Sequence, residues 1–95
     1  MLTIDKDLEE IIPEFLELTR KDINCILNAL PSEDYETIRV AGHTMKGSGA
    51  GYGFDLITEI GAKIEQYAKN RSGEHIRKLT EELIAYLDNI TIVFE

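Results

Sequence analysis

The sequence predicts an all-α protein, an antiparallel four-helix bundle with a short N-terminal helical cap. Apolar residues recur every three or four positions through most of the chain, which is the spacing of one buried helix face. Proline, glycine and short polar runs interrupt this pattern and leave four amphipathic segments. The connections between the segments are short, and short connections favour antiparallel neighbours.

Each segment has boundary signals and an apolar stripe. Pro13 suits the first turn of the first helix, where a missing N–H is harmless. Pro31 and Ser32 end this helix and cap the second, with Glu33 and Asp34 favourable near its N-terminus. The polar run 70–73 separates the third helix from the fourth. The four stripes consist of Ile12, Phe15, Leu16, Ile23, Ile26 and Leu30; Ile38, Gly42, Met45 and Gly49; Ile57, Ile60, Ile64 and Tyr67; and Ile76, Leu79, Leu83, Leu87 and Ile90.

Both ends of the chain lie outside these helices. We expect a short helical turn at about Asp5 to Ile11 that covers one end of the bundle, because the residue before a proline is driven out of the α region. The C-terminal residues Ile90 to Glu95 are β-branched and aromatic but too few for a sheet of their own. We therefore expect an extended tail packed against the bundle.

The composition sets limits on class and partners. Ninety-five residues suffice for one modest core, so we assign residues 1–95 to a single domain. Hydrophobic residues make up 43% and charged residues 29%, which is typical of a soluble globular protein. No stretch approaches the roughly 20 apolar residues of a membrane span, and the N-terminus lacks a signal-peptide layout. We expect a cytoplasmic protein that binds no membrane.

The charge and the cysteine content add two expectations. The formal charge of −8 repels nucleic acid, so we expect no nucleic-acid partner. The lone Cys25 lies among apolar residues in the first helix, where a small apolar side chain would serve equally well. We therefore expect Cys25 in the core.

The segment around His43 carries the features that indicate a function. When the buried stripe of the second helix faces the core, His43 points outward. Arg39 lies one turn before it on the same face, Lys46 and Gly47 lie one turn after it, and Ala50 follows a turn later. This face is basic and small in an acidic protein. Stability does not explain Gly47, because a glycine inside a helix costs about 1 kcal/mol relative to alanine.

These residue types suit phosphoryl transfer. A free imidazole has a pKa of about 6.5, so a histidine near neutral pH is a nitrogen nucleophile that needs no separate strong base. We predict that His43 accepts the phosphoryl group and that Lys46 neutralises the oxygens of the transferred group. Gly47 and Ala50 would leave clearance for a partner's active-site loops, and Arg39 would belong to the docking face.

The glycines between residues 47 and 53 superficially resemble a nucleotide-binding loop. A dinucleotide fingerprint follows a strand, and a P-loop ends in Gly-Lys-Ser/Thr, whereas here the lysine precedes the glycines and no strand is predicted. We interpret Gly51 and Gly53 as the turn between the second and third helices, and Gly49 as a point of close helix packing.

The stretch Ala41 to Gly53, AGHTMKGSGAGYG, resembles the histidine-containing phosphotransfer (Hpt) domain family. The family pattern is a small residue, His, two residues, Lys-Gly, several small residues, an apolar residue and Gly. It falls here on His43, Lys46, Gly47, Ser48, Tyr52 and Gly53. The chain departs from the pattern where Tyr52 replaces the usual aliphatic residue and Gly51 the usual polar one. With four amphipathic helices, the resemblance covers essentially the whole chain.

The resemblance implies an activity and partners. Hpt domains take a phosphoryl group from a receiver-domain aspartate or a histidine kinase and pass it to a receiver aspartate, without catalytic activity of their own. The implied partners are response-regulator receiver domains, a histidine kinase, or both. We expect no enzyme activity, no metal or cofactor in this chain, Mg²⁺ carried by the receiver, and a monomer.

In this family a Gln or Glu on the following helix often hydrogen-bonds the ring nitrogen that does not react. The matching position is Glu65, at the edge of the third stripe, and Gln66 beside it is a second candidate. A carboxylate that accepts the Nδ1 proton would leave Nε2 free to attack. The residues alone leave open whether Glu65 has this role or is an ordinary surface glutamate.

Other functions stay open at this stage. The same bundle fits the phosphoacceptor domain of a chemotaxis-type kinase, excised from a longer chain. A non-catalytic helical adaptor would use the face around His43 for docking alone, which requires neither Lys46 nor Gly47 at their spacing. A metal-binding bundle would require converging carboxylates, and we interpret acidic pairs such as Glu81-Glu82 as solvated. His75, which has no small neighbours, is interpreted as a solvated histidine at a helix start.

Overall fold

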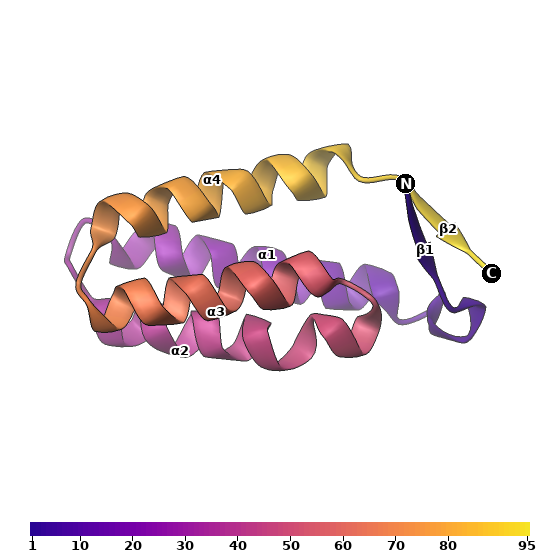
Figure 1. Ribbon diagram of the computed structural model, residues 1–95, viewed down its shortest axis with the longest axis horizontal. Helices are drawn as coiled ribbons and strands as arrows, with labels where there is room; N and C mark the ends of the chain where they lie inside the picture. The colour runs from indigo at the N-terminus through magenta and orange to yellow at the C-terminus, as the bar shows by residue number, and fades with distance from the viewer.

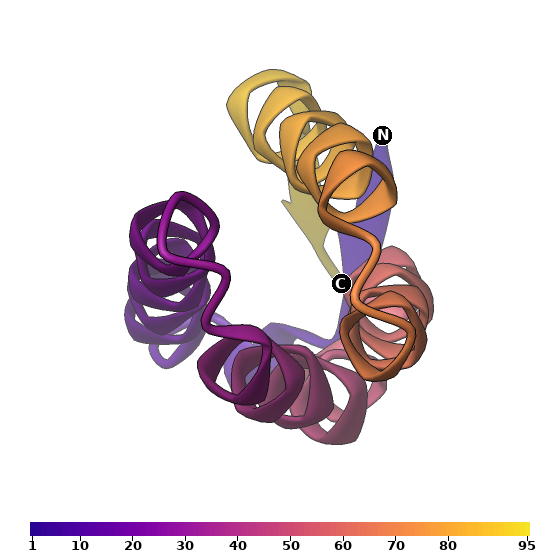
Figure 2. The same ribbon diagram turned by 90° about the vertical axis from the view of Figure 1, so that its left-hand side faces the viewer.

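The protein is an elongated bundle of four antiparallel helices, as the sequence predicts. The computed structural model describes residues 1–95 and measures 41 × 21 × 18 Å. The helices are α1 (Ile12–Ala29), α2 (Tyr35–Ser48), α3 (Asp55–Lys69) and α4 (Gly73–Asn89), shown in Figure 1. Seen along the bundle axis, they follow one another around a ring in chain order (Figure 2). None of them combines the length and the apolar composition that crossing a membrane requires.

The boundary signals act largely as expected, with one correction. Pro13 lies in the first turn of α1, and residues 70–72 of the polar run separate α3 from α4, which begins at Gly73. The N-cap of α2 is Asp34 and not Ser32, because the Asp34 carboxylate accepts the Thr37 N–H at 3.2 Å. The Ser32 hydroxyl instead donates to the carbonyl of Ala29 at the end of α1. The prediction that Ser32 caps the second helix is therefore wrong.

The predicted stripes supply most of the core, but Cys25 does not belong to it. Ile38, Met45 and Ile64 are completely or almost completely buried. Cys25 is exposed, contrary to the prediction. Successive helix positions point about 100° apart, so its apolar neighbours Ile23 and Ile26 face the core while Cys25 does not.

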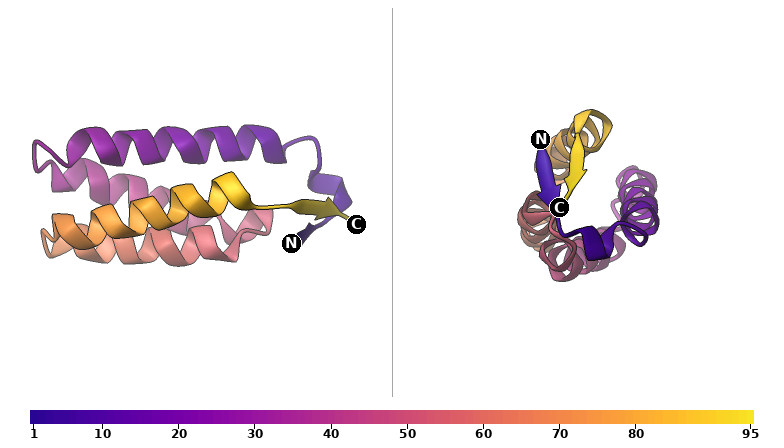
Figure 3. Two further views of the ribbon diagram at one scale, coloured as in Figure 1. Left: turned by 90° about the horizontal axis from the view of Figure 1, so that it is seen from above. Right: turned by 90° about the vertical axis from the view of Figure 1, so that its right-hand side faces the viewer.

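The two chain ends pair with each other, which the sequence analysis did not predict. Strand β1 (Leu2–Ile4) and strand β2 (Ile92–Phe94) form a two-stranded parallel sheet, with Leu2 opposite Ile92 and Ile4 opposite Phe94. The sheet lies beyond one end of the bundle (Figure 3). The C-terminal segment is extended and packs against the core through Ile92 and Phe94, as predicted, but it is also a strand, because its partner comes from the other end of the chain.

The N-terminal cap is shorter than expected. Its helical part is one 3₁₀ turn, η1 (Lys6–Leu8), inside the predicted segment from Asp5 to Ile11. Ile4, which precedes this turn, is only 2% exposed and packs against Gly53 in the connection between α2 and α3. The sheet and η1 together close this end of the core.

The contact between α2 and α3 is the closest in the bundle, and glycines permit it. A Cβ atom on Gly61 would lie 2.6 Å from the backbone nitrogen of Lys46, and one on Gly42 would lie 2.8 Å from that of Glu65. A Cβ on Gly49 would lie 2.7 Å from the backbone nitrogen of Thr58, as its predicted packing role requires. The two backbones therefore touch along α2. A Cβ on Gly47, in contrast, would meet open space.

Alanine should have opposite effects at Gly61 and Gly47. Gly61→Ala should lower the free energy of unfolding by about 1–3 kcal/mol, because the new methyl group overpacks a backbone contact. Gly47→Ala is the matched control and should raise it by up to about 1 kcal/mol through helix propensity. Urea denaturation measures both changes. A Gly61→Ala protein at least as stable as the original would show that α2 and α3 are not in backbone contact.

Candidate functional site

His43 lies on the outer surface of α2, with one ring nitrogen bonded and the other free. Its side chain is 67% exposed. Nδ1 lies 2.9 Å from Oε2 of Glu65 on α3, and Nε2 has no hydrogen-bond partner in the protein. The imidazole is therefore held through Nδ1, and Nε2 faces solvent.

Glu65 is a buried carboxylate with two cationic or proton-donating neighbours. Its side chain is only 9% exposed. Burial alone would raise the pKa of Glu65, but the hydrogen bonds from His43 and from Lys46, together with their charges, outweigh burial and place this pKa below its ordinary value. Glu65 is therefore ionised at neutral pH.

The charge on Glu65 determines the state of the His43 ring. An ionised carboxylate only accepts hydrogen bonds, so the proton in the 2.9 Å contact belongs to Nδ1 of His43. In the neutral imidazole, Nε2 then carries the free lone pair. The nitrogen that faces solvent is therefore the one with the free lone pair.

Lys46 shares the same carboxylate. Its Nζ lies 3.4 Å from Oε1 of Glu65, while His43 uses Oε2. The Lys46 side chain is still half exposed. The Glu65 carboxylate thus holds a histidine and a lysine from adjacent turns of α2 on the same side of the bundle.

The helix contact described above explains why these side chains meet. Gly42 precedes His43 in the chain, and its Cα hydrogen faces the backbone of Glu65 where a methyl group would clash. Thr58 fixes the end of α2, because its hydroxyl accepts the Ala50 N–H at 2.7 Å and donates to the carbonyl of Lys46 at 3.1 Å. The close approach and this double hydrogen bond set the position of the two helices.

Sequence reasoning missed Gly61 and Thr58. Gly61 had a usable signal, since it is a glycine in a helix interior four residues before Glu65. Thr58 had none, because a threonine on a helix surface is common and its partners lie across a turn. Gly61 permits the backbone contact and Thr58 hydrogen-bonds to backbone groups, so neither belongs to the exposed face around His43.

The other predicted site residues are placed as follows. Ala50 is exposed near the end of α2. Arg39 is bound by Glu36, with contacts of 3.0 Å from Nε and 2.6 Å from Nη2, and does not contact His43. Gln66 is exposed and makes no hydrogen bond to the ring, which Glu65 occupies.

The predicted turn glycines differ in what they require. Gly53 has a φ of 91°, in the left-handed region that favours glycine, and it ends the 3₁₀ turn η2 (Ala50–Tyr52). Gly51 has ordinary φ, and a Cβ there would meet open space. The turn therefore depends on Gly53 and not on Gly51.

The second histidine has different surroundings. His75 is exposed in the first turn of α4, where its ring stacks on Tyr67 at 4.4 Å between centroids. Its Nδ1 lies 2.6 Å from the hydroxyl of Ser72. This ring forms no ion pair with a carboxylate.

Glu65 should make stability depend on pH in a defined direction. Its pKa is lower in the folded than in the unfolded protein, so its stabilising effect is complete above the unfolded pKa of about 4.3 and is lost as pH falls through the folded pKa. The difference in unfolding free energy between the original protein and Glu65→Gln should thus decrease as pH falls from about 5 through the acid range in which Glu65 becomes protonated. Urea denaturation across this range measures it. A difference that stays constant would mean that Glu65 is not paired in the folded state.

Comparison with known proteins identifies the family. The family model described as Hpt domain matches residues 10–91. The multistep phosphorelay regulator 1 of Schizosaccharomyces pombe is 29% identical over 90 residues, which cover 90% of this chain and 30% of that protein. The chain thus spans less than a third of the length of this relative. No solved structure matches the chain significantly. Because the family model covers most of the sequence and the whole four-helix bundle, this chain belongs to the Hpt domain family, whose members are phosphoryl carriers.

Proposed function

We propose that the chain is a phosphorelay intermediate that accepts a phosphoryl group on Nε2 of His43 and exchanges it with receiver-domain aspartates. One observation carries this proposal: an exposed histidine whose Nδ1 donates to a buried, ionised Glu65. The name of the S. pombe relative, a multistep phosphorelay regulator, supports the same activity.

The transfer step follows from this geometry. The lone pair of Nε2 attacks the phosphorus of a receiver's aspartyl phosphate, a P–N bond forms, and the P–O bond to the aspartate breaks so that the carboxylate leaves. Nδ1 keeps its proton, and Glu65 offsets the positive charge that develops on the ring. Transfer to a receiver is the same step reversed, with Mg²⁺ supplied by the receiver.

Lys46 would assist through its charge. Its Nζ is held on the Glu65 carboxylate one turn from His43, and half of its side chain is exposed. From there the ammonium group can approach the phosphoryl oxygens, which carry negative charge throughout the transfer. Glu65 would thus position both the nucleophile and the neutralising cation.

The surface around His43 suits the approach of another protein. A Cβ on Gly47 would meet no side chain or neighbouring element within 4 Å, and Val40, one turn before His43, is 50% exposed. A pocket of about 260 Å³ between α1 and α2 is lined by residues that include Val40 and Thr44. We assign receiver docking to this surface, with Arg39 at its edge.

A purely structural adaptor accounts less well for the site. Docking alone does not require a buried carboxylate under the histidine ring, since burial of Glu65 opposes its ionisation. The energetic cost of burying the Glu65 charge is explained if this charge keeps the proton on Nδ1 of His43. This contact therefore favours phosphoryl transfer.

Replacement of His43 should abolish phosphoryl uptake. His43→Gln should take up no label from a phosphorylated receiver domain in the presence of Mg²⁺, because no nucleophile remains on this face. The original protein should carry label that is labile in acid and stable in alkali. His75→Gln is the matched control and should be labelled normally. Label on the His43→Gln protein would refute the assignment.

A large side chain at Gly47 should block transfer and leave the fold intact. The side chain added in Gly47→Leu would point into open space on the helix surface. It would, however, obstruct a partner that approaches His43. We expect transfer to be slower by about tenfold or more, with an unchanged circular dichroism spectrum. Gly51→Leu also points into open space and, lying two helical turns beyond His43, should transfer normally. Equal transfer rates for the Gly47→Leu and original proteins would mean that the partner does not approach His43 over Gly47.

A further inference from the structure

The terminal sheet is an addition to the Hpt bundle. The family match covers residues 10–91, so β1, η1 and β2 lie outside it. His43 lies in the middle of α2, whereas the sheet extends beyond the end of the bundle (Figure 3). The phosphoryl transfer proposed for His43 therefore does not explain the exposed edge of the sheet.

The outer edge of β2 has unpaired backbone groups. Leu2 N–H donates to Thr91 at 2.8 Å, Glu95 N–H donates to Ile4 at 3.0 Å, and Lys6 N–H donates to Glu95 at 3.0 Å. Neighbouring residues of a strand direct their N–H and C=O groups to opposite sides. Since Thr91 and Glu95 face β1, Ile92 and Phe94 direct their groups away from it. The sheet has only the two strands β1 and β2, so no strand pairs with this side of β2.

This edge has one of the features that normally limit strand addition, its length of only three residues. Besides shortness, free edges are usually protected by lysine, proline or a bulge, and the sequence of β2 can be checked for these three. The strand Ile92-Val93-Phe94 contains none of these, and all three residues are partly exposed. Its β-branched and aromatic side chains favour extended structure. The edge is thus suited to accept an extended segment through main-chain hydrogen bonds.

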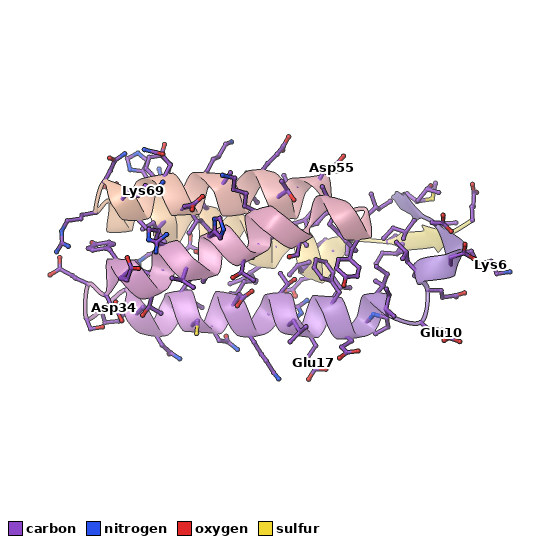
Figure 4. The ribbon with its side chains drawn as sticks, turned by 90° about the horizontal axis from the view of Figure 1, so that it is seen from below. Lys6, Glu10, Glu17, Asp34, Asp55 and Lys69 are labelled. Carbon is purple, nitrogen blue, oxygen red and sulfur yellow. The ribbon has the colours of Figure 1, made fainter.

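The charge around the edge indicates which segment fits. The stretch from Asp5 to Glu10 carries four exposed carboxylates and one lysine, and none of its charged side chains forms an ion pair. It lies beside the end of β2, because Lys6 N–H donates to Glu95, itself a further acid. Figure 4 shows Lys6 and Glu10 at this end of the molecule. A second copy of the chain would bring two such acidic ends together, whereas a basic segment is attracted.

We propose that the outer edge of β2 binds an extended, basic segment of another protein, which adds to the sheet as a third strand. Main-chain hydrogen bonds to Ile92 and Phe94 supply the docking geometry, and the carboxylates between Asp5 and Glu10 select for lysine or arginine. This binding is independent of the phosphoryl transfer proposed for His43.

Amide hydrogen exchange of the unmodified protein tests the edge directly. The probe is a blocked peptide of alternating lysine and valine, with alternating glutamate and valine as control. Without peptide, the amides of Ile92 and Phe94 should exchange fast and that of Glu95 slowly. The lysine peptide should protect Ile92 and Phe94, less so at high salt, and the glutamate peptide should not. Lack of protection at about 1 mM lysine peptide, or equal protection by both peptides, overturns the proposal.

A substitution at the edge gives a second measurement. Ile92→Pro removes an N–H that faces away from β1, so the affinity for the lysine peptide should fall by about tenfold, the size of one main-chain hydrogen bond. Ile92→Val keeps the N–H and should bind normally. Asp7→Asn should weaken binding without changing the sheet. Equal affinity of the Ile92→Pro and Ile92→Val proteins, or a dimer of the original protein that Ile92→Pro dissociates, contradicts the proposed partner.

Discussion

The backbone contact between α2 and α3 is the constraint on which the site depends. Glycines at positions 42, 49 and 61 let the two helices approach until a single methyl group would clash. At this separation Glu65 on α3 contacts the ring of His43 while its own side chain stays buried. With wider helix spacing, Glu65 would be an ordinary solvated residue and the His43 tautomer would be undefined.

Burial and the neighbouring charges act in opposite directions on the pKa of Glu65. Removal from water opposes its ionisation, and contacts from His43 and Lys46 outweigh this effect, so the pKa of Glu65 falls. The same carboxylate orients two side chains with different tasks in the proposed transfer. The exposed face above them is left with small residues, so the ring is held on its inner side and Nε2, the nitrogen that we propose reacts, stays accessible. This division explains how a helix surface without a pocket around His43 can serve as a transfer site.

Sequence reasoning predicted the features that follow from local periodicity and failed where long-range pairing decides. The four helices and the outward direction of His43 follow from helical spacing alone. The sheet could not be predicted, because neither Leu2–Ile4 nor Ile92–Phe94 is long enough to indicate a strand without its partner. The contact to Glu65 could be suggested but not decided, since it depends on helix separation. That separation is set partly by Gly61, which helical periodicity does not distinguish.

The central claim is that Glu65 keeps the proton on Nδ1 of His43 so that Nε2 takes the phosphoryl group. Nuclear magnetic resonance of the phosphorylated protein, labelled with nitrogen-15 in histidine, tests it most directly. The account predicts phosphorus–nitrogen coupling to Nε2 of His43 and a protonated Nδ1. Coupling to Nδ1, or to a nitrogen of His75, would contradict it.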